Sequence, residues 1–276
     1  MLQETFEFPA REPFSTPTVS VVIPALNEAD NLEHVLPFVP EWVHEVILVD
    51  GHSTDRTVEV AQELRPGIRI VQQIGKGKGA ALRSGFAAAT GQIIVMLDAD
   101  GSTDPREIPA YVGSLMAGAD FAKGSRFLQG GGTADMSLHR RMGNLAFTMG
   151  VRILFGGTYT DLCYGYNAFW ASVLPQLELD GDGFEIETMM NVRALRTGLK
   201  VAEVPSYEFK RVYGVGRLRT FPDGWRVLKT IVKEGRSHHF GPQAKRNYAL
   251  QLNEAASTVG SLTKTASFSE VSADVR

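Results

Sequence analysis

The sequence has few of the features that mark secreted or membrane-embedded proteins. It contains a single cysteine, Cys163, so no disulfide can form within the chain and a reducing compartment is expected. No apolar run approaches the roughly 20 uninterrupted residues that a membrane-spanning helix needs. The first residues have neither a basic region nor an apolar core, so we expect no signal peptide. These absences favour a cytoplasmic protein.

The net charge is also small. Over the 276 residues, 28 Lys and Arg oppose 31 Asp and Glu, which gives −3. Dedicated nucleic-acid binders are usually strongly basic, so we expect no nucleic-acid partner. No G-x-G-x-x-G pattern follows the first predicted strand, which argues against a nicotinamide-dependent dehydrogenase. Hydrophobic residues make up 43% of the chain, which is enough for a globular core.

Short apolar runs alternate with helical patterns over the first hundred residues. Four runs rich in Val, Ile and Leu predict buried strands: residues 19–23, 46–49, 68–71 and 93–97. We expect the first strand to stop at Pro24, and Ser53 or Thr54 to cap the helix after the second strand. This alternation predicts an α/β fold with a Rossmann-like, mostly parallel sheet and helices on both faces.

The remainder of the chain is less regular. Residues 184–197 have helical spacing, and residues 201–204 are typical of a strand. We predict a flexible lead-in over residues 1–17 and a single domain over residues 18–240. Residues 241–276 are rich in Ser and Thr, and we expect them to form a disordered tail.

Polar side chains follow three of the predicted strands where these end. They are Asn27 and Glu28 after the first strand, Asp50 after the second, and Asp98 and Asp100 after the fourth. Ligands of parallel sheets collect at the carboxyl ends of the strands. On an extended strand end, Asp98 and Asp100 would point the same way, about 6.5 Å apart, and together can hold one Mg²⁺ or Mn²⁺. Asp50 can accept hydrogen bonds from a ribose or a base.

A glycine- and lysine-rich loop at residues 75–79 opens the next predicted helix. Its backbone N–H groups, together with Lys76 and Lys78, can hold an anion such as a donor phosphate at the helix N-terminus. The loop lacks the GxxxxGK[ST] spacing of a phosphate-binding loop. A basic loop without a ligand is an equal alternative.

Three segments occur in an order that is typical of a known family: residues 21–28 (VVIPALNE), 49–57 (VDGHSTDRT) and 97–100 (LDAD). With them the chain resembles the family 2 inverting glycosyltransferases of the GT-A fold. Later segments resemble its dolichol-phosphate or polyprenyl-phosphate mannosyltransferase branch: residues 124–127, 140–141, 161–166, 183–187, 203–205 and 209–211. The match spans roughly residues 18–235, and several weak motifs in one order make a specific pattern.

The resemblance implies a role for each matching residue. The residues that would contact the nucleotide are Pro24, Asn27, Glu28 and Asp50. Asp98 and Asp100 would hold the metal on the donor diphosphate. The residues that would hold the acceptor phosphate or the diphosphate are Arg126, Arg140 or Arg141, and Arg211, because the planar fork of arginine suits phosphate oxygens.

The chain also departs from the family at two places. His52 lies in the segment Asp50-Gly51-His52-Ser53, where the family often has Asp-Asp-Gly-Ser, so one acidic contact is missing. After Arg211, residues 214–217 read GVGR where the branch often has Gly-x-Ser-Lys. These departures leave the sugar and the acceptor open.

The acceptor decides whether a general base is needed. A lipid phosphate is already ionised at neutral pH, whereas an alcohol needs a base. The candidate bases are Asp182, Glu185 and Glu187. In a helix over residues 184–197, Glu185 and Glu187 point to different faces, so at most one of them can face the site. Asp182 is better explained as a capping or solvated carboxylate.

The segment from residue 210 to residue 236 is strongly basic. Eight Lys and Arg face two acidic residues there, a local charge of +6. Trp225, Leu228 and Val232 recur at helical spacing. This pattern is typical of a basic amphipathic helix on an anionic membrane surface, and equally of a helix that packs on the core with one solvated face.

Together these patterns predict a metal-dependent transferase that moves a hexose, mannose or glucose, from a GDP- or UDP-sugar to a polyprenyl phosphate. We expect it to act in the cytoplasm, peripherally at the inner face of the membrane. One alternative is a transferase of the same fold with a soluble alcohol acceptor. Others are a haloacid-dehalogenase-like phosphohydrolase, since residues 98–103 resemble its Asp-x-Asp-Gly-Thr motif, and a non-catalytic nucleotide-sugar binder. The oligomeric state stays open.

Overall fold

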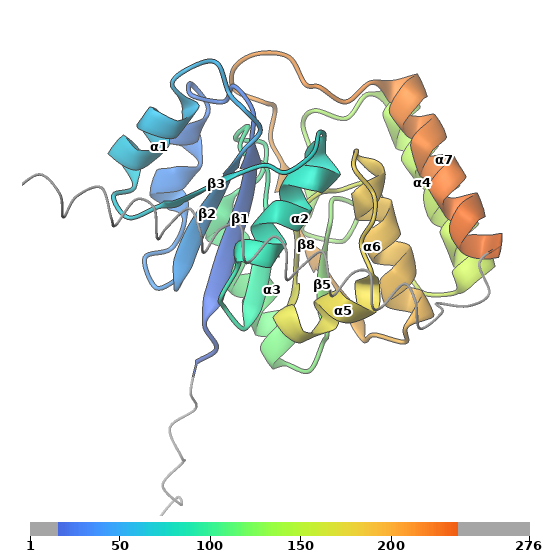
Figure 1. Ribbon diagram of the computed structural model, residues 1–276. Coiled ribbons are helices and arrows are strands. Elements are labelled where there is room, and N and C mark those ends of the chain that lie inside the picture. Colours follow the sequence, from blue (N-terminus) through green and yellow to red (C-terminus); the bar gives the residue numbers. More distant parts are fainter. Residues whose placement is uncertain (1–15, 237–276) are drawn as a thin grey trace, which may run out of the picture.

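A seven-stranded sheet forms the centre of the computed structural model, which describes residues 16–236 (Figure 1). The predicted tail and all but the last two residues of the predicted lead-in lie outside the described residues. The strand order is β3 (Arg69–Gln72), β2 (Glu45–Asp50), β1 (Val19–Ala25), β4 (Ile93–Met96), β7 (Asn167–Trp170), β5 (Phe121–Ser125) and β8 (Val201–Pro205). Only β7 runs antiparallel to its neighbours, which confirms the mostly parallel sheet.

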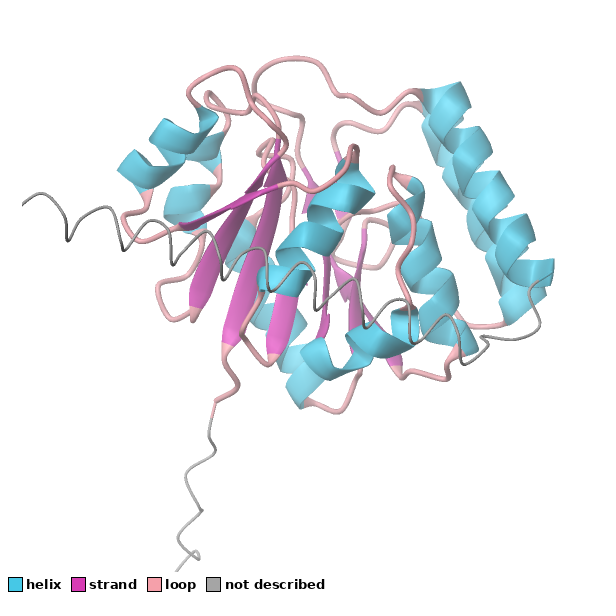
Figure 2. Ribbon diagram, viewed as in Figure 1, coloured by secondary structure: helices cyan, strands magenta, loops and turns pink. Residues whose placement is uncertain are grey.

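Seven α-helices surround the sheet within the described residues (Figure 2). They are α1 (Thr57–Leu64), α2 (Lys78–Ala88), α3 (Ile108–Met116), α4 (Leu138–Phe155), α5 (Leu174–Leu177), α6 (Glu185–Arg196) and α7 (Thr220–Arg236). Single 3₁₀ turns occur at η1 (Leu32–His34), η2 (Leu36–Phe38), η3 (Pro105–Glu107) and η4 (Ala171–Val173). The short strands β6 (Gly132–Thr133) and β9 (Tyr207–Glu208) pair separately.

Both faces of the sheet are covered, as the apolar strands predict. On one face Val21 and Ile23 pack with η1, η2, α1 and α3. On the other face Val22 and Ile47 pack with α2, α5 and α6. Because successive side chains of a strand point to opposite faces, strands that are buried on both sides must be apolar throughout. Helices on both faces are therefore confirmed.

The helix α2 lies unusually close to the sheet at Gly85. A Cβ atom there would lie 2.8 Å from Cγ2 of Val49 and still closer to Cγ1 of Val22. Only glycine allows this approach. It brings the first turn of α2, with Lys78, to the carboxyl end of the strands.

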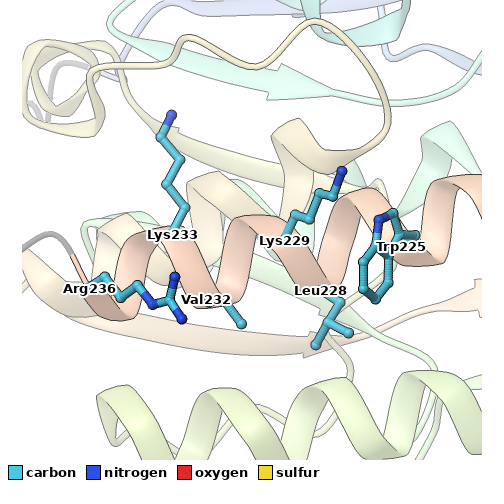
Figure 3. Close-up of a pocket in the computed structure, with 6 residues that line it drawn as sticks. All are labelled: Trp225, Leu228, Lys229, Val232, Lys233 and Arg236. Atoms are coloured by element: carbon cyan, nitrogen blue, oxygen red, sulfur yellow. The ribbon is translucent and has the colours of Figure 1, made fainter.

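Helices α4 and α7 lie outside this sandwich, against α6. A third core cluster, which includes Val151, Val192 and Ile231, joins the three helices. A shallow groove of about 630 Å³ follows the outer side of α7 and is lined by Trp225, Leu228, Lys229, Val232, Lys233 and Arg236 (Figure 3). None of the helices between residues 16 and 236 has the length and apolar character needed to cross a bilayer.

Two local predictions were wrong. Strand β1 continues through Pro24 to Ala25, because Pro24 lies beyond the last residue paired with β4 and its missing N–H group interrupts no ladder. Helix α1 begins at Thr57 with no capping side chain on Arg56, so neither Ser53 nor Thr54 caps it. Both residues instead bond to the loop that follows β1, as described below.

Candidate active site

The parallel strands β1, β2 and β4 bring their carboxyl ends together. Ala25 pairs with Asp50 across β1 and β2, and the N–H group of Leu97 donates to the carbonyl of Val22 at 3.3 Å. The loops that follow these strands therefore start side by side. They carry the acidic side chains that the sequence places at this end of the sheet.

The turn after β2 holds Asp50 in place. Its carboxylate accepts the N–H group of Ser53 at 3.1 and 3.3 Å, and only 4% of the residue is exposed. His52 adopts a left-handed conformation with φ of 64° and is exposed. The turn thus orients Asp50 and leaves His52 in solvent.

The loop after β1 is tied to this turn through Asn27. Its backbone N–H donates to Oγ of Ser53 at 2.9 Å, and its side-chain oxygen accepts the N–H group of Thr54 at 2.7 Å. The N–H of Glu28 donates to Oγ1 of Thr57 at 2.9 Å. These bonds explain why Ser53 and Thr54 do not cap α1.

Arg211 connects the first and fourth strand ends. Its Nη1 lies 3.1 Å from Oδ2 of Asp100, its Nη2 is ion-paired with Oε2 of Glu28, and its Nε donates to the carbonyl of Tyr213 at 2.6 Å. Burial lowers the pKa of Arg211, but the hydrogen bond and charge of Glu28 outweigh it and raise the pKa above its ordinary value. Arg211 is thus a fixed cation between two carboxylates.

The segment that carries Arg211 crosses this end of the sheet as a strap, which we define as residues 209–217. Phe209 donates its N–H to the carbonyl of Ser102 at 2.8 Å. Tyr213 and Asn31 exchange two hydrogen bonds, of 2.9 and 3.2 Å. The strap therefore joins the loops of β1 and β4 as well as their carboxylates.

Lys78 forms a second cation–carboxylate cluster. Its Nζ lies 2.6 Å from Oδ1 of Asp98 and 2.6 Å from Oε1 of Glu187 on α6. Burial alone would lower the pKa of Lys78, but the two carboxylates raise it well above its ordinary value. Burial raises the pKa of Asp98, which Lys78 opposes and the charges of Asp100 and Glu187 reinforce, and the result is about 6.

Gly165 covers this cluster directly. A Cβ atom on it would lie 2.7 Å from Oε1 of Glu187, 3.0 Å from Nζ of Lys78 and 3.2 Å from Oδ2 of Asp98. The loop is held from below by Lys123, whose buried Nζ donates to the carbonyl of Tyr164 at 2.8 Å. No side chain larger than hydrogen fits at position 165 without displacing the cluster.

The residues present can supply part of the ligand set of a divalent cation. Asp98 and Asp100 offer hard carboxylate oxygens, while between residues 16 and 236 no group of three or more His, Cys, Asp or Glu surrounds one point. Mg²⁺ and Mn²⁺ in phosphate sites are typically held by one or two carboxylates together with substrate phosphates and water. Two carboxylates with phosphate oxygens match that pattern.

The anion site expected at the N-terminus of α2 is not available. The N–H groups of Gly79 and Ala80 donate to the carbonyl of Asp182, at 2.8 and 3.3 Å. A Cβ atom on Gly77 or Gly79 would collide with the backbone of residues 181–182. The glycines of this loop therefore allow close packing against another loop, and of the two alternatives for this loop the geometry favours the one without a bound anion.

The two glutamates of α6 point different ways, as their spacing predicts. Glu187 faces Lys78, whereas Glu185 accepts the N–H group of Gly183 at 2.9 Å. Asp182 is exposed and pairs with Arg83 at 2.7 Å, in line with a solvated carboxylate. Of the three candidate bases, only Glu187 faces the strand ends.

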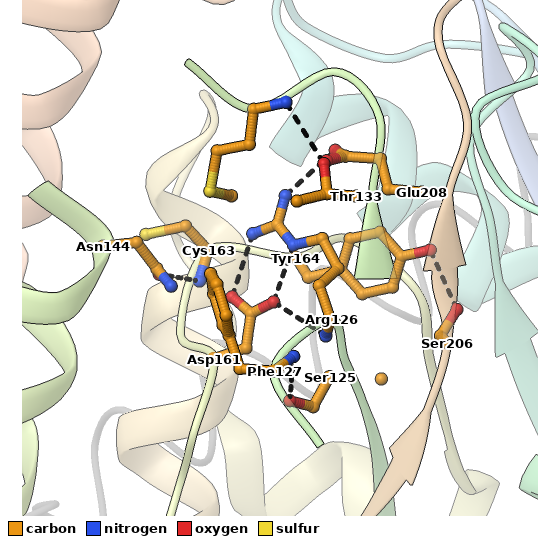
Figure 4. A network of polar contacts seen from close by, with 12 residues as sticks. Ser125, Arg126, Phe127, Thr133, Asn144, Asp161, Cys163, Tyr164, Ser206 and Glu208 are labelled. Atoms are coloured by element: carbon orange, nitrogen blue, oxygen red, sulfur yellow. Dashed lines mark hydrogen bonds and ion pairs between the residues drawn. The ribbon is translucent and has the colours of Figure 1, made fainter. Parts of the chain in front are cut away.

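Arg126 directly follows β5, but it lies in a buried network whose carboxylates are Asp161 and Glu208 and not those at the ends of β1, β2 and β4 (Figure 4). Its Nε and Nη2 bond to Asp161 at 2.6 and 2.9 Å, its Nη1 bonds to Glu208 at 2.9 Å, and its side chain is 1% exposed. Burial lowers the pKa of Arg126, but the hydrogen bonds and charge of Asp161 outweigh it and raise the pKa. Its phosphate contact stays a prediction that this geometry does not support, because two carboxylates already neutralise the guanidinium.

The neighbouring arginines at the start of α4 contact local groups. Arg140 pairs with Asp135 at 3.3 Å, and the guanidinium of Arg141 lies 5.4 Å from the ring centre of Phe127. The structure therefore does not choose between them as phosphate ligands.

Sequence reasoning missed Gly165 and the partners of Lys78. Lys78 and Glu187 are more than a hundred residues apart, and no local pattern links them. The segment 161–166 was noted for its resemblance to the family. A glycine between two tyrosines does not reveal that its α-carbon faces the side chains of Lys78, Asp98 and Glu187.

Comparison with known proteins identifies the family of this chain. A family model described as "Glycosyl transferase family 2" matches residues 20–177. The dolichol-phosphate mannosyltransferase of Pyrococcus furiosus is 31% identical over 210 residues, which cover 73% of this chain and 59% of that protein. The polyprenol monophosphomannose synthase of Mycolicibacterium smegmatis is 31% identical over 215 residues, which cover 72% of this chain and 80% of that protein.

A solved structure shares the fold over most of the chain. Glucosyl-3-phosphoglycerate synthase from Mycobacterium tuberculosis, in complex with Mn²⁺, UDP and glucosyl-3-phosphoglycerate, aligns with a TM-score of 0.64 and 25% identity. The alignment covers 86% of this chain and 88% of that one. Several curated relatives are longer than this chain, which spans 53%, 64% and 59% of the length of three of them.

Proposed function

Because the chain belongs to glycosyl transferase family 2, we propose that it transfers a hexose from a nucleoside-diphosphate sugar to a polyprenyl phosphate. Family membership makes it a glycosyltransferase with the GT-A fold. The donor, the acceptor and the role of each residue are parts of the proposal. We propose inversion at the sugar carbon, with the acceptor oxygen attacking from the side opposite the diphosphate.

The donor is proposed to lie across the ends of β1, β2 and β4. Asp50 would accept hydrogen bonds from the nucleoside, which would also contact Pro24, Asn27 and Glu28. Asp98 and Asp100 would hold Mg²⁺ or Mn²⁺ on the diphosphate, where a bound cation neutralises the charge of the leaving group. The Mn²⁺ and UDP of the M. tuberculosis structure support this arrangement, and both UDP- and GDP-sugars are candidate donors.

The observation that carries the choice of acceptor is the state of the candidate bases. The charge of Glu187 is matched by Lys78 at 2.6 Å, so a proton taken up by Glu187 would leave Lys78 without that partner. Glu185 is bound to the N–H of Gly183 and faces away. An acceptor that arrives ionised needs neither residue, and a phosphomonoester is such an acceptor.

Arg211 is the proposed contact for the reacting phosphates. Its two terminal nitrogens already reach carboxylates on two strand ends, and its planar fork suits phosphate oxygens. A phosphate that enters between Glu28 and Asp100 would exchange one ion pair for another. The names of the P. furiosus and M. smegmatis relatives support a lipid phosphate.

A soluble acceptor is the second candidate. The M. tuberculosis protein with 25% identity is named glucosyl-3-phosphoglycerate synthase, and glucosyl-3-phosphoglycerate carries no polyprenyl lipid. If this chain used an alcohol, Glu187 would have to separate from Lys78 and act as the base. With an alcohol acceptor, the variant Glu187→Gln should lose transfer entirely. With a phosphate acceptor, the same variant should keep substantial transfer activity.

The test is release of nucleoside diphosphate from a panel of GDP- and UDP-sugars with Mn²⁺ or Mg²⁺, with and without a short polyprenyl phosphate. We expect release that depends on the lipid phosphate, and a loss of about 10²–10³-fold in Asp100→Asn, because charge stabilisation at the leaving group is lost. Asp182→Asn is the matched control, because Asp182 is exposed and pairs only with Arg83 among the described ion pairs.

The other outcomes separate the alternatives. Release that requires an alcohol instead of the lipid phosphate supports the second candidate. Release of free inorganic phosphate supports a phosphohydrolase, and donor binding without turnover supports a nucleotide-sugar binder. Each of these contradicts the proposal.

A further inference from the structure

Helix α4 carries an apolar stripe that faces solvent. Its members recur every three or four residues, so they share one side of the helix. They are Leu138, Met142, Leu145, Met149 and Ile153, with exposures of 74, 64, 61, 44 and 77%. On the inner side of the same helix Asn144, Thr148 and Val151 are buried, and Phe147 and Phe155 pack against the third core cluster. Helix α4 is thus apolar on its outer side as well as on the side that packs against the protein.

Helix α7 carries a similar stripe. Phe221, Trp225, Leu228 and Val232 repeat at the same spacing and are 88, 58, 39 and 39% exposed. The last three line the groove of Figure 3, together with Lys229, Lys233 and Arg236. Apolar and basic side chains therefore alternate around the outer side of α7.

The two helices lie side by side at one end of the molecule (Figure 1). The two helices are in contact near both ends of α7: a Cβ atom on Gly224 would lie at van der Waals distance, 3.8 Å, from Cζ of Phe147, and one on Gly235 would lie 3.7 Å from Cζ of Phe155. Because these contacts follow the same order along both helices, α4 and α7 run parallel. Both stripes are left on the outside of the pair.

The charges on this pair of helices have one sign. The sequence of α4 contains no Asp or Glu, and the two acidic residues of α7, Asp223 and Glu234, are only 4 and 2% exposed. The basic residues of the pair are Arg140, Arg141, Arg152, Arg226, Lys229, Lys233 and Arg236. Every charged side chain that the two helices expose is therefore basic, although the whole chain has a net charge of −3.

From this combination we infer that the outer faces of α4 and α7 together dock onto an anionic lipid bilayer. A contiguous exposed apolar surface marks an interaction site. A second copy of this face would bring like charges together, whereas anionic headgroups complement them. The inference deepens the proposed function, since a polyprenyl phosphate is presented at a bilayer, and it can be tested without any donor or acceptor.

The two helices contribute differently to this surface. The stripe of α4 supplies apolar side chains that can enter the boundary between headgroups and acyl chains. On α7, Nζ of Lys229 lies 5.6 Å from the ring centre of Trp225, and tryptophan is enriched at membrane interfaces. Long basic side chains can keep their charges at headgroup level while their stems cover apolar surface.

The experiment is flotation of the full chain with phosphatidylcholine vesicles, with and without 30% phosphatidylglycerol, in the absence of nucleotide and polyprenyl phosphate. We expect flotation with the anionic vesicles only, and its decrease as salt is raised. Equal binding to both kinds of vesicle, or to neither, overturns the inference.

Matched variants locate the surface. Met149→Asp on α4 should lower the partition coefficient by about tenfold or more, and Met116→Asp at the end of α3, where the methionine is similarly exposed at 50%, should leave it unchanged. Lys229→Gln should lower it about fivefold, and Lys200→Gln, on the loop before β8, should have no effect.

Two further results would contradict the inference. The controls could lower binding as much as the test variants do. Alternatively, sedimentation equilibrium could show a dimer that Met149→Asp dissociates, which would assign the face to a second copy. Because no substrate is present, failure here is distinguishable from failure of the proposed transfer reaction.

Discussion

Lys78 and Arg211 each place one positive charge between two carboxylates that come from different parts of the chain. Lys78 joins Asp98 to Glu187, and Arg211 joins Glu28 to Asp100. Carboxylates gathered at the ends of parallel strands repel one another, and such pairs reduce that repulsion. The two lysine- and arginine-centred clusters therefore make an acidic strand end compatible with a stable fold.

Gly165 tests whether the Lys78 cluster must keep its geometry. In Gly165→Ala, the new methyl group would displace the ends of Glu187 and Lys78, which lie 2.7 and 3.0 Å from the added Cβ. We expect donor turnover to fall about 10- to 100-fold, since small misplacements near a reacting centre have effects of this size. Gly143→Ala, with no atom within 4 Å of the added Cβ, is the control. Equal turnover in the two variants would contradict this assignment.

Arg126 is assigned to stability by its burial. In Arg126→Met, Asp161 and Glu208 lose their partner, and breaking a buried ion pair costs about 3–5 kcal/mol. Arg106→Met is the control, because Arg106 is exposed and pairs with Asp104 at 2.9 Å, and an exposed ion pair adds little to stability, so this variant should unfold close to the wild type. Urea unfolding at pH 7 measures both. A small loss in the Arg126 variant would return Arg126 to the list of phosphate ligands.

The same pair predicts how stability depends on pH. Burial raises the pKa of Asp161, but its hydrogen bonds with Arg126 outweigh burial and hold the pKa below its ordinary value. A lowered pKa contributes stability above about pH 3.9, and this contribution is lost as the pH falls through the folded value. Without Arg126, burial would raise the pKa of Asp161, so acidification would relieve the variant. The stability gap between wild type and Arg126→Met should narrow from pH 7 to about pH 4, and a constant gap would contradict this.

At the scale of elements, the strands could be predicted from the sequence and the caps could not. Strands β1, β2 and β4 are buried on both faces, and such burial requires an uninterrupted apolar run in the sequence. The capping role of Ser53 and Thr54 depended on what else lay within reach of their hydroxyl and N–H groups. Asn27 of another loop lies within reach, and tertiary contacts of this kind leave no local signal.

The packing of α2 on the sheet gives a prediction at this scale. Gly85→Ala should cost about 1–3 kcal/mol through overpacking against Val22 and Val49. Gly113→Ala, in the exposed part of α3 with open space around it, should instead stabilise by about 0.5–1 kcal/mol through helix propensity. Thermal unfolding distinguishes them by sign. A gain in both variants would show that α2 can move away from the sheet.

At the site, too, some features could be predicted from the sequence and others could not. Strand alternation predicted that Asn27, Glu28, Asp50, Asp98 and Asp100 gather at one end of the sheet, and the structure brings them there. The arginine assignments relied on motif resemblance alone. Arg211 meets these carboxylates, whereas Arg126 is neutralised elsewhere, because resemblance gives the residue but not the partner that burial assigns to it.

For the whole molecule, the separation of charge matters more than its sum. At the strand ends, Glu28, Asp98, Asp100 and Glu187 are paired with two cations. The charges that α4 and α7 expose are basic, although the net charge of the whole chain is −3. A protein built this way can hold a metal–diphosphate group at one place and face anionic lipid at another.

This charge arrangement predicts the response to metal. Mn²⁺ alone should barely change the melting temperature, because Asp98 and Asp100 already have Lys78 and Arg211 as partners. Mn²⁺ with a saturating nucleoside diphosphate, at about 100 times its dissociation constant, should raise it by about 5–10 °C. Differential scanning fluorimetry measures both shifts. The same rise in melting temperature with Mn²⁺ alone would contradict the claim that Asp98 and Asp100 hold the metal only together with the diphosphate.

The most direct test of the proposed reaction follows the phosphorus of the acceptor. Phosphorus-31 NMR of a short polyprenyl phosphate incubated with the enzyme, a divalent metal and the preferred nucleotide-sugar should show the phosphomonoester signal replaced by a phosphodiester. Nucleoside diphosphate should appear in equal amount, and both changes should be about 10²–10³-fold slower with Asp100→Asn. Release of nucleoside diphosphate while the phosphomonoester signal stays intact would contradict transfer to a lipid phosphate.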